Sequence, residues 1–509
     1  MELAGWLGAT ILAAITCFRV ALWLRGHPYP AEDAAMLMRY AQNLAGGHGI
    51  VFNVGQSPVD GATDMGFMLA LAAVIKVGAS PGAGVVALDV LAQVATVLVV
   101  YGSGRRVAGA SIPVSLVAAA SIAFGLGPMY IEARFGTPVF ALAIAVTWML
   151  AIRYVQSPSR RHFLQYGAAG LVAGIVRPEG VIFFALSFVG LLLPLPRGGR
   201  REPIVILASV FVPIGLAYFI WHWAYFGYPL PNPYYRKGGV YPTTLADGFT
   251  LLRSWMAPAA VLYLLVLARR WRVGLFHLIP IAGFTLAWAF VSSEANYVDR
   301  FQYPLLVIAA VSVPALWQTA RDSIARLPVP AWWTLGLVGT LAFSGLWVRA
   351  DKAAATQAMG RDSRYTVAVR LSRLPGVHTM AVTEAGLLPF YSGWTALDLW
   401  GLNNENIAHH GLSAQDLTRA SPDLVMIHWN PTSTLKGWAQ MESLALKWVH
   451  EHHYILAADY ERAPDQQHLY FVKPVPRDRA IIAAVRIPDY FLGYAPAPDV
   501  APRPTIPGG

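Results

Sequence analysis

Residues 27–64 read HPYPAEDAAMLMRYAQNLAGGHGIVFNVGQSPVDGATD and form the one long polar segment early in a chain that is otherwise apolar almost to residue 350. Pro28 and Pro30 predict the end of the preceding apolar helix. Glu32 and Asp33 then open a segment whose apolar residues recur at helical spacing. This pattern predicts a short amphipathic helix that lies on a membrane surface without crossing it. The acidic pair either caps this helix, where negative charge is favourable, or takes part in chemistry, and the residues alone leave both readings open.

The composition indicates a membrane protein. The chain has 509 residues, of which 56% are hydrophobic and 13% are charged, whereas an average soluble domain has about 25% charged residues. Its net charge of +10 would suit nucleic acid, but the arginines lie in short loops between apolar runs, which is typical of membrane topology. We therefore expect a polytopic membrane protein that binds no nucleic acid. The single cysteine, Cys17, excludes an intramolecular disulfide.

Residues 1–350 are predicted to form an α-helical membrane domain with about eleven transmembrane helices. Residues 26–82 are its first outer loop, with a second juxtamembrane helix over Met65–Val77. The predicted spans are Leu3–Leu24, Gly84–Tyr101, Ala108–Phe124, Val139–Ile152, Phe163–Ile175, Val181–Leu195, Ile204–Trp223, Phe249–Leu267, Gly274–Val291, Pro304–Gln318 and Trp332–Val348.

Arginine-rich turns predict the orientation of these helices. Such turns face the cytoplasm in most membrane proteins. If all five are cytoplasmic, the helices alternate consistently only when Met65–Val77 does not cross the membrane. The loop 26–82 and everything after Val348 then lie on the outer side. The turns contain Arg105 and Arg106; Arg153, Arg160 and Arg161; Arg197, Arg200 and Arg201; Arg269, Arg270 and Arg272; and Arg321 and Arg326.

Four further outer loops carry ionisable residues close to prolines or glycines. Ionisable groups at membrane depth are hypotheses for a functional site, although each alone could be an interfacial anchor or a structural ion pair. Their collection on the same side as Glu32 and Asp33 favours a site. The residues are Glu132 and Arg134; Arg177 and Glu179; Arg236 and Lys237; and Glu294, Asp299 and Arg300.

Residues 351–495 are predicted to form a soluble α/β domain on the outer side, because strand and helix patterns alternate there. Helices are expected over Tyr365–Leu374 and Thr434–His452. Residues 496–509 are a proline-rich tail. The predicted strands are His378–Thr383, Thr395–Leu399, Leu424–Trp429, Ile455–Asp459 and His468–Val472.

The chain resembles membrane glycosyltransferases of the GT-C superfamily, in the branch that contains the mycobacterial terminal β-(1→2)-arabinofuranosyltransferase. That branch has an acidic pair, a RYAxNLxxGxGxVxNxG motif and a veGxT-like step in its first outer loop. They correspond here to Glu32–Asp33, RYAQNLAGGHGIVFNVG from Arg39 and VDGAT from Val59. The resemblance continues in order through most of the chain, with RPEG from Arg177, YFGYPLPNPYYRK from Tyr225, RFQYPLL from Arg300 and the string from Leu397 to Ala408.

The resemblance implies a GT-C fold and an inverting transfer of a sugar, with arabinofuranose a candidate. The donor would be a polyprenyl-phosphate sugar in a bacterial cytoplasmic (inner) membrane, and the acceptor an outer glycan, glycolipid or protein. Asp33 or Glu32 would be the general base. Lys237, Arg236 and Arg300 would stabilise the leaving phosphate. Substrate contacts are expected from Arg39, Tyr40, Asn43, Glu132, Arg177, Glu179, Asn232 and Tyr235.

The sequence departs from the family pattern at two positions, and two other functions remain as alternatives. Glu32 replaces the usual first aspartate, and Gly136 stands where a loop acid is expected, with Glu132 as its candidate substitute. Some relatives use a divalent metal, which these residues neither require nor place. A transporter or lipid flippase would also carry charges at membrane depth, but it needs neither an acidic pair nor a large outer domain. A non-catalytic scaffold would not need the acids and cations.

Overall fold

The structure, a computed structural model, describes residues 2–25, 29–238, 259–288, 296, 300–324, 363–463, 466–474 and 478–487. The predicted span Trp332–Val348, most of Phe249–Leu267, Glu294, Asp299 and the tail 496–509 lie outside these residues. The described part of every other predicted span is largely helical. Within the described part, six helices are long and apolar enough to cross a membrane, and shorter apolar helices pack among them. The protein is therefore a multi-pass membrane protein, as predicted.

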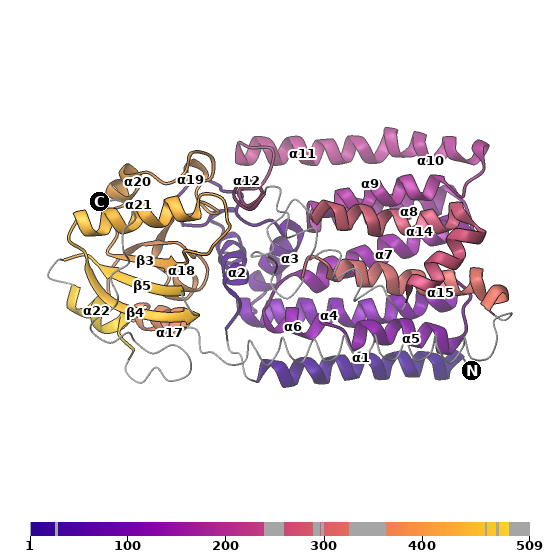
Figure 1. The fold of residues 1–509 in the computed structure, drawn as a ribbon, viewed down its shortest axis with the longest axis horizontal. Helices are drawn as coiled ribbons and strands as arrows, with labels where there is room; N and C mark the ends of the chain where they lie inside the picture. Colours follow the sequence, from indigo (N-terminus) through magenta and orange to yellow (C-terminus); the bar gives the residue numbers. More distant parts are fainter. Residues whose placement is uncertain are drawn as a thin grey trace.

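The long helices lie side by side in a bundle (Figure 1). Prolines in the first turn begin several of them, because proline lacks the N–H that a helix start leaves unpaired. The helices of the bundle are α1 (Glu2–Leu24), α4 (Pro81–Gly102, continued by a π-helical turn Ser103–Val107), α5 (Ile112–Ala123), α7 (Thr137–Gln156), α8 (Arg160–Val176), α9 (Glu179–Leu192), α10 (Arg201–Ile206, after a 3-10 turn Arg197–Arg200), α11 (Val212–Phe226, after a π-helical turn Leu207–Phe211), Ala259–Arg269, α14 (Trp271–Ala287) and α15 (Tyr303–Ile324).

The bundle core is built around α7. This helix packs against α4, α8 and α15, and its Trp148 is fully buried and donates a hydrogen bond to Ser312 at 2.7 Å. Arg19 donates to the carbonyl oxygens of Ala123 and Gly125 at 3.0 and 3.1 Å. These carbonyls lie at the end of α5, where a helix leaves its acceptors unpaired. Arg19 therefore joins α1 to the C-terminal end of α5.

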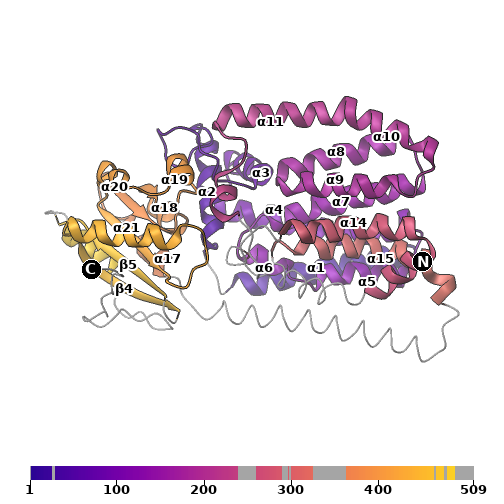
Figure 2. The ribbon, with the colours of Figure 1, turned by 45° about the horizontal axis from the view of Figure 1, so that its top comes forward.

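Four short helices lie at one end of the bundle: α2 (Glu32–Ala45), α3 (Met65–Lys76), α6 (Gly127–Glu132) and α12 (Asn232–Lys237). The twelve residues of α3 rise only about 18 Å, which is too short for a hydrocarbon core of about 30 Å. In both views, α2 and α12 lie between the bundle and the C-terminal domain (Figures 1 and 2). Residues of the first loop thus form the junction between the two parts of the protein.

The C-terminal domain is the predicted α/β domain. Its five-stranded sheet has the order β2-β1-β3-β5-β4, in which β1 is parallel to β2 and β3, and β5 is antiparallel to β3 and β4. Helix α21 starts at Trp438, later than predicted, because Gly437 precedes it with a left-handed φ of 73°. The elements are α17 (Ser363–Leu371), β1 (Thr379–Val382), α18 (Leu387–Ser392), β2 (Thr395–Asp398), α19 (Glu405–His410), α20 (Ala414–Ala420), β3 (Leu424–Trp429), α21 (Trp438–Glu451), β4 (Ile455–Ala463), β5 (Gln466–Val472) and α22 (Asp478–Val485).

Candidate active site

Asp33 lies in the first turn of α2 and forms ion pairs with two basic side chains from distant parts of the chain. The Oδ2 atom of Asp33 is 3.2 Å from Lys237 Nζ, at the end of α12, and 2.8 Å from Arg300 Nη2, just before α15. Its side chain is still 34% exposed. Burial alone would raise the pKa of Asp33, but Lys237 and Arg300 outweigh it and hold this pKa well below its usual range. Asp33 is thus a carboxylate that is both ionised and accessible.

Aromatic rings surround the two cations. The guanidinium carbon of Arg300 lies 4.1 Å from the centre of the Phe135 ring, and Lys237 Nζ lies 5.6 Å from the centre of the Trp400 ring. Such faces attract cations and exclude water from around them. Because Trp400 belongs to the C-terminal domain, this domain supplies part of the site. No local pattern in the sequence indicated either aromatic residue.

Glu32, the other half of the acidic pair, points to different partners. Its carboxylate accepts hydrogen bonds from the backbone N–H groups of Gly386 and Leu387, and it lies 3.1 Å from Arg364 Nη1. Successive helical residues point about 100° apart, so neighbouring acids reach different surroundings. The structure brings Asp33, Lys237 and Arg300 together and directs Glu32 into the C-terminal domain.

Arg236, the third predicted phosphate ligand, has its described neighbours in the C-terminal domain. A Cβ atom placed on Gly437 would be 3.2 Å from Arg236 Nη2, so the guanidinium lies against the C-terminal domain. Burial lowers the pKa of Arg236, and its charged neighbour Asp398 opposes that shift. The side chain of Tyr235 lies against the same domain, with its ring centre 4.4 Å from that of His409.

Three predicted substrate ligands have hydrogen-bond partners within the protein. Arg39 is buried; it donates to Asn53 Oδ1 at 2.9 Å and to the carbonyl oxygens of Phe52 at 2.7 Å and Trp394 at 2.9 Å. Asn43 donates to the carbonyl oxygens of Val51 and Phe52 at 2.9 and 3.0 Å. Tyr40 donates to Asn403 Oδ1 at 3.0 Å. Arg39 and Tyr40 thus join the first loop to the C-terminal domain, and Asn43 braces the first loop itself. Their contact with substrate stays a prediction.

The glycine of the VDGAT motif, Gly61, is required by the space around it. A Cβ atom there would lie 2.5 Å from the hydroxyl of Tyr40 and 2.3 Å from the side-chain oxygen of Asn403. Only glycine leaves room for this close approach between the first loop and the C-terminal domain. The neighbouring Asp60 accepts the N–H of Asn232 on its carbonyl oxygen at 2.9 Å and pairs through its side chain with His222 at 3.1 Å. The loop therefore also fixes the start of α12.

A second ionic group joins the RPEG turn to the first loop. Arg177 Nη1 is 2.9 Å from Asp64, and Arg177 Nη2 is 3.1 Å from Glu179. Burial raises the pKa of Asp64, while Arg177 opposes that shift. The predicted ligands Arg177 and Glu179 thus pair with each other and with Asp64. The sequence signal that could have identified Asp64 is its position at the end of the polar stretch, one residue before α3.

The remaining predicted ligands are buried. Glu132 ends α6 in the loop that joins α2, because Ala31 donates its N–H to the carbonyl oxygen of Ala133 at 3.0 Å. Asn232 is fully buried at the start of α12, and neither polar atom of its side chain has a hydrogen-bond partner among the described residues.

One group of described residues resembles a metal donor set. Glu384, His428 and His468 bring their ligand atoms within 4.8 Å of one another, and two histidines with one carboxylate are common ligands of Zn²⁺. However, Arg364 donates to the same Glu384 oxygen that His468 approaches. A guanidinium at this oxygen opposes a divalent cation, so the group fits a metal poorly.

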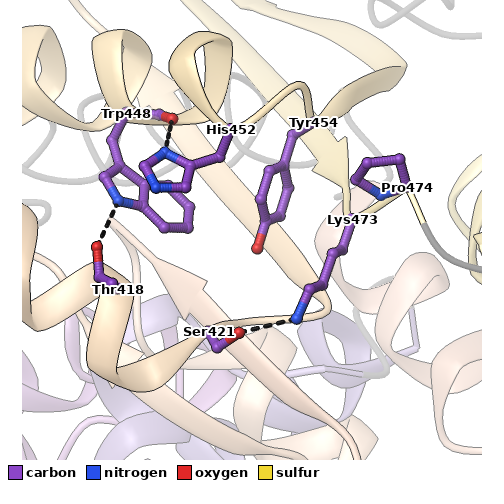
Figure 3. Close-up of a pocket in the computed structure, with 7 residues that line it drawn as sticks. All are labelled: Thr418, Ser421, Trp448, His452, Tyr454, Lys473 and Pro474. Carbon is purple, nitrogen blue, oxygen red and sulfur yellow. Dashed lines mark hydrogen bonds between the residues drawn. The ribbon is translucent and has the colours of Figure 1, made fainter.

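A hollow of about 200 Å³ lies on the C-terminal domain (Figure 3), and none of its lining residues belongs to the cation cluster. It lies beside Lys473, which follows β5 and donates to Ser421 at 2.8 Å. Val472, the last residue of β5, pairs with Leu424, the first residue of β3. The hollow therefore lies at the amino end of β3, whereas Glu384 and His428 mark the opposite end. Its lining residues are Thr418, Ser421, Trp448, His452, Tyr454, Lys473 and Pro474.

Comparisons with solved structures define the class of fold. ArnT from Cupriavidus metallidurans in its apo state matches with a TM-score of 0.62 over 96% of this chain and 100% of its own, at 13% identity. The same protein bound to undecaprenyl phosphate matches with a TM-score of 0.56 over 92% and 98%, also at 13% identity. The chain therefore has the GT-C membrane fold, as the resemblance predicted.

Comparison of sequences gives one characterised relative and one matching domain profile. The chain is 28% identical over 242 residues to the terminal β-(1→2)-arabinofuranosyltransferase of Mycobacterium tuberculosis, a match over 45% of this chain and 37% of that protein. The sequence profile of a domain of unknown function, DUF8728, matches residues 353–472. The curated match confirms the resemblance to the arabinofuranosyltransferase, and it spans little more than a third of that relative.

Proposed function

We propose that the protein is an inverting glycosyltransferase that moves a sugar from a polyprenyl-phosphate donor to a hydroxyl group of an acceptor. The observation that carries this proposal is the convergence of Asp33, Lys237 and Arg300. An exposed carboxylate beside two fixed cations suits a reaction in which a hydroxyl is deprotonated and a phosphate leaves. The GT-C fold, shared with a protein that was solved with undecaprenyl phosphate, supports the choice of donor.

The proposed step is a single displacement. The acceptor oxygen attacks the anomeric carbon from the side opposite the phosphate, while Asp33 takes the hydroxyl proton. The bond between the anomeric carbon and the phosphate oxygen breaks, and its electron pair leaves with the polyprenyl phosphate. Lys237 and Arg300 stabilise the charge that develops on this phosphate. Attack opposite the leaving group inverts the anomeric centre.

The resting contacts of Asp33 suggest how the donor activates it. A carboxylate held by two cations has a low pKa and is a weak base. When the donor phosphate binds, Lys237 and Arg300 pair with it and their interaction with the Asp33 carboxylate weakens. Burial then raises the pKa of Asp33 with less opposition, and the negative phosphate raises it further. Donor binding therefore makes Asp33 a stronger base at the moment when one is needed.

Helix α11 offers an apolar path for the lipid tail. It leads directly to α12, which carries Lys237, and in the view of Figure 1 it runs along the edge of the bundle. Only 11% of the most apolar part of Arg197–Phe226, the segment that includes α11, is buried within the protein. Leu216, Ile220 and Trp223 are among its exposed residues. We propose that the polyprenyl chain lies along α11, with its phosphate at Lys237.

The proposed sugar is arabinofuranose, because the curated relative is named as an arabinofuranosyltransferase. Purified protein should be mixed with synthetic polyprenyl-phosphoryl arabinofuranose and a panel of oligosaccharide, glycolipid and peptide acceptors. The expected result is a product of the opposite anomeric configuration and release of polyprenyl phosphate, detected by NMR and mass spectrometry. Lipid movement across a vesicle membrane without cleavage of the sugar–phosphate bond would instead support a flippase and overturn the transferase.

We propose that the site and the C-terminal domain face the outer side of a bacterial inner membrane. Helix α10, which directly follows the turn Arg197–Arg200, lies at the end of the bundle away from this domain (Figure 1). Arginine-rich turns favour the cytoplasm. We therefore predict that, in a Cys17→Ser background, a membrane-impermeant maleimide labels Lys447→Cys in intact cells and labels Arg161→Cys only after permeabilisation. Both chosen side chains are exposed. The reverse labelling pattern would contradict the orientation.

The pKa of Asp33 leads to a prediction about pH dependence. In the free enzyme, Lys237 and Arg300 lower this pKa, so the carboxylate stays ionised to low pH. The donor complex should have a higher pKa, as argued above. Because kcat/KM reports groups in the free enzyme and kcat reports groups in the complex, we expect the acid limb of kcat at higher pH than that of kcat/KM. Coincident limbs would show that the donor does not change the surroundings of the base.

A further inference from the structure

Helix α2 presents two faces with different tasks. Asp33 faces the cations of the candidate site, whereas Glu32 faces α18 of the C-terminal domain. The N–H groups that Glu32 accepts belong to Gly386 and Leu387, the N-cap and first residue of α18. These donors have no partner within their own helix, and no side chain of α18 caps them. Glu32 therefore caps a helix that begins more than 350 residues later in the chain.

Arg39 completes the same contact two helical turns further along α2. It donates to the carbonyl oxygens of Pro389, within α18, and Trp394, just after it. Glu32 and Arg39 lie on one face of α2, because a seven-residue step returns to about the same side of a helix. The two ends of α18 are thus bound by two residues of α2, one acidic and one basic.

Behind this contact lies a buried ionic network. Arg364, on α17, approaches both Glu32 Oε2 and Glu384. The Glu384 carboxylate is in turn 3.1 Å from His428 Nδ1 and 3.2 Å from His468 Nε2. His428 and His468 are paired directly across β3 and β5. Burial lowers the pKa of His468 to about 3, so its ring is neutral near neutral pH. The sheet therefore holds Glu384, Glu384 holds Arg364, and Arg364 reaches Glu32.

The same domain also contacts α12, which carries the other half of the candidate site. The Trp400 ring lies beside Lys237 Nζ, and the His409 ring lies with its centre 4.4 Å from that of Tyr235. Asp33 and Lys237 come from separate segments, yet both segments rest on the C-terminal domain. The relative position of the base and one cation therefore depends on this domain.

We propose that Arg364 is a positioning residue for catalysis: by fixing Glu32 against α17 and α18, it holds the first turn of α2 so that Asp33 faces Lys237 and Arg300. Among the described residues, the link from Arg364 to the site runs through Glu32. This inference rests on the proposed function for its effect on turnover, while the contact that it describes can be tested without any activity. It gives the C-terminal domain a direct part in the geometry of the site.

Steady-state kinetics test the effect on turnover. Because a displacement of about 1 Å can lower a rate about 100-fold, Arg364→Met is expected to lower kcat by about 10- to 100-fold. Donor KM and direct binding of polyprenyl phosphate should change less than about twofold, because Lys237 and Arg300 remain. Arg364→Lys should restore part of the rate, since its single charge can still approach one carboxylate. Loss of donor binding equal to the loss of rate would overturn the proposal.

A matched control and a double mutant separate positioning from general destabilisation. Arg370 lies on the same helix and donates to the carbonyl oxygen of Ala483, away from α2, so Arg370→Met should keep wild-type kinetics. Glu32→Gln combined with Arg364→Met should be no slower than the slower single variant, because both remove one contact. Multiplying effects would contradict the shared contact. The proposal also fails if purified wild-type protein contains about one divalent ion per chain and chelation reproduces the Arg364→Met kinetics.

Hydrogen–deuterium exchange tests the contact independently of the reaction. Wild-type Gly386 and Leu387 should exchange slowly, because Glu32 accepts both N–H groups. We expect faster exchange of the peptide covering residues 385–392 in Arg364→Met and Glu32→Gln, but not in Arg370→Met. If wild type shows no sugar transfer but these exchange changes occur, the proposed function fails and the contact stands. If wild type is active and exchange is unchanged in Arg364→Met, the positioning role of Arg364 is rejected.

Discussion

Asp33→Asn is expected to lower kcat for sugar transfer by about 10²- to 10⁴-fold, the usual contribution of a positioned general base. The amide has nearly the same shape as the carboxylate but cannot take the acceptor proton. Folding should be nearly unchanged, because the side chain is one-third exposed, at 34%. Donor binding should not weaken, because the substitution leaves Lys237 and Arg300 in place and removes the carboxylate with which the phosphate competes. The measurement is single-turnover transfer at saturating donor, together with direct binding of polyprenyl phosphate.

Glu32→Gln is the matched control for this experiment, since it removes the neighbouring charge by the same chemistry. The described partners of Glu32 lie in the C-terminal domain, so its variant should retain more activity than Asp33→Asn. The sequence alone left the choice of base between these two acids open. A larger loss of kcat in Glu32→Gln than in Asp33→Asn would reassign the base. Wild-type turnover in both variants would show that neither acid is the general base and that α2 has only a structural role.

Arg300→Gln and Lys237→Ala are expected to weaken use of the donor, each by about 1.5–3 kcal/mol, or about 10- to 150-fold in kcat/KM. Each variant removes a cation that can form a charge-assisted hydrogen bond with phosphate. Part of the loss should appear in kcat, because charge on the leaving phosphate grows in the transition state. The measurement is kcat/KM for the polyprenyl-phosphate donor, with binding of the product lipid measured separately.

Arg236→Gln provides the contrast within the same short helix. Arg236 neighbours Lys237 in sequence but lies against Gly437 of the C-terminal domain. Its replacement should therefore change kcat/KM for the donor by less than about threefold, well below the loss expected for a charge-assisted contact. If Arg236→Gln and Lys237→Ala lower kcat/KM for the donor equally, Arg236 is also a phosphate ligand. Unchanged donor use in both Arg300→Gln and Lys237→Ala would overturn the assignment of the phosphate site.

The roles of the motif residues show where sequence reasoning reaches its limit. Arg39, Tyr40 and Asn43 belong to a polar motif on an amphipathic helix, and such residues serve equally well as ligands or as an interface. Their partners lie in the following loop and in the C-terminal domain, up to 355 residues away for Arg39 and Trp394. Arg364, Glu384 and Trp400 were not predicted, because single polar or aromatic residues in a soluble domain carry no local pattern that points to a distant site.

The sequence by itself determined the class of protein, the positions of the described spans and strands, and the segments that carry the site. These properties are local, because hydrophobic run length, residue alternation and loop charge can be read along the chain. Tertiary structure alone decided that Asp33 meets Lys237 and Arg300 while Glu32 meets Arg364. Adjacent helical side chains differ in direction by about 100°, and what each one meets depends on segments 200 to 350 residues away, whose placement no local pattern encodes.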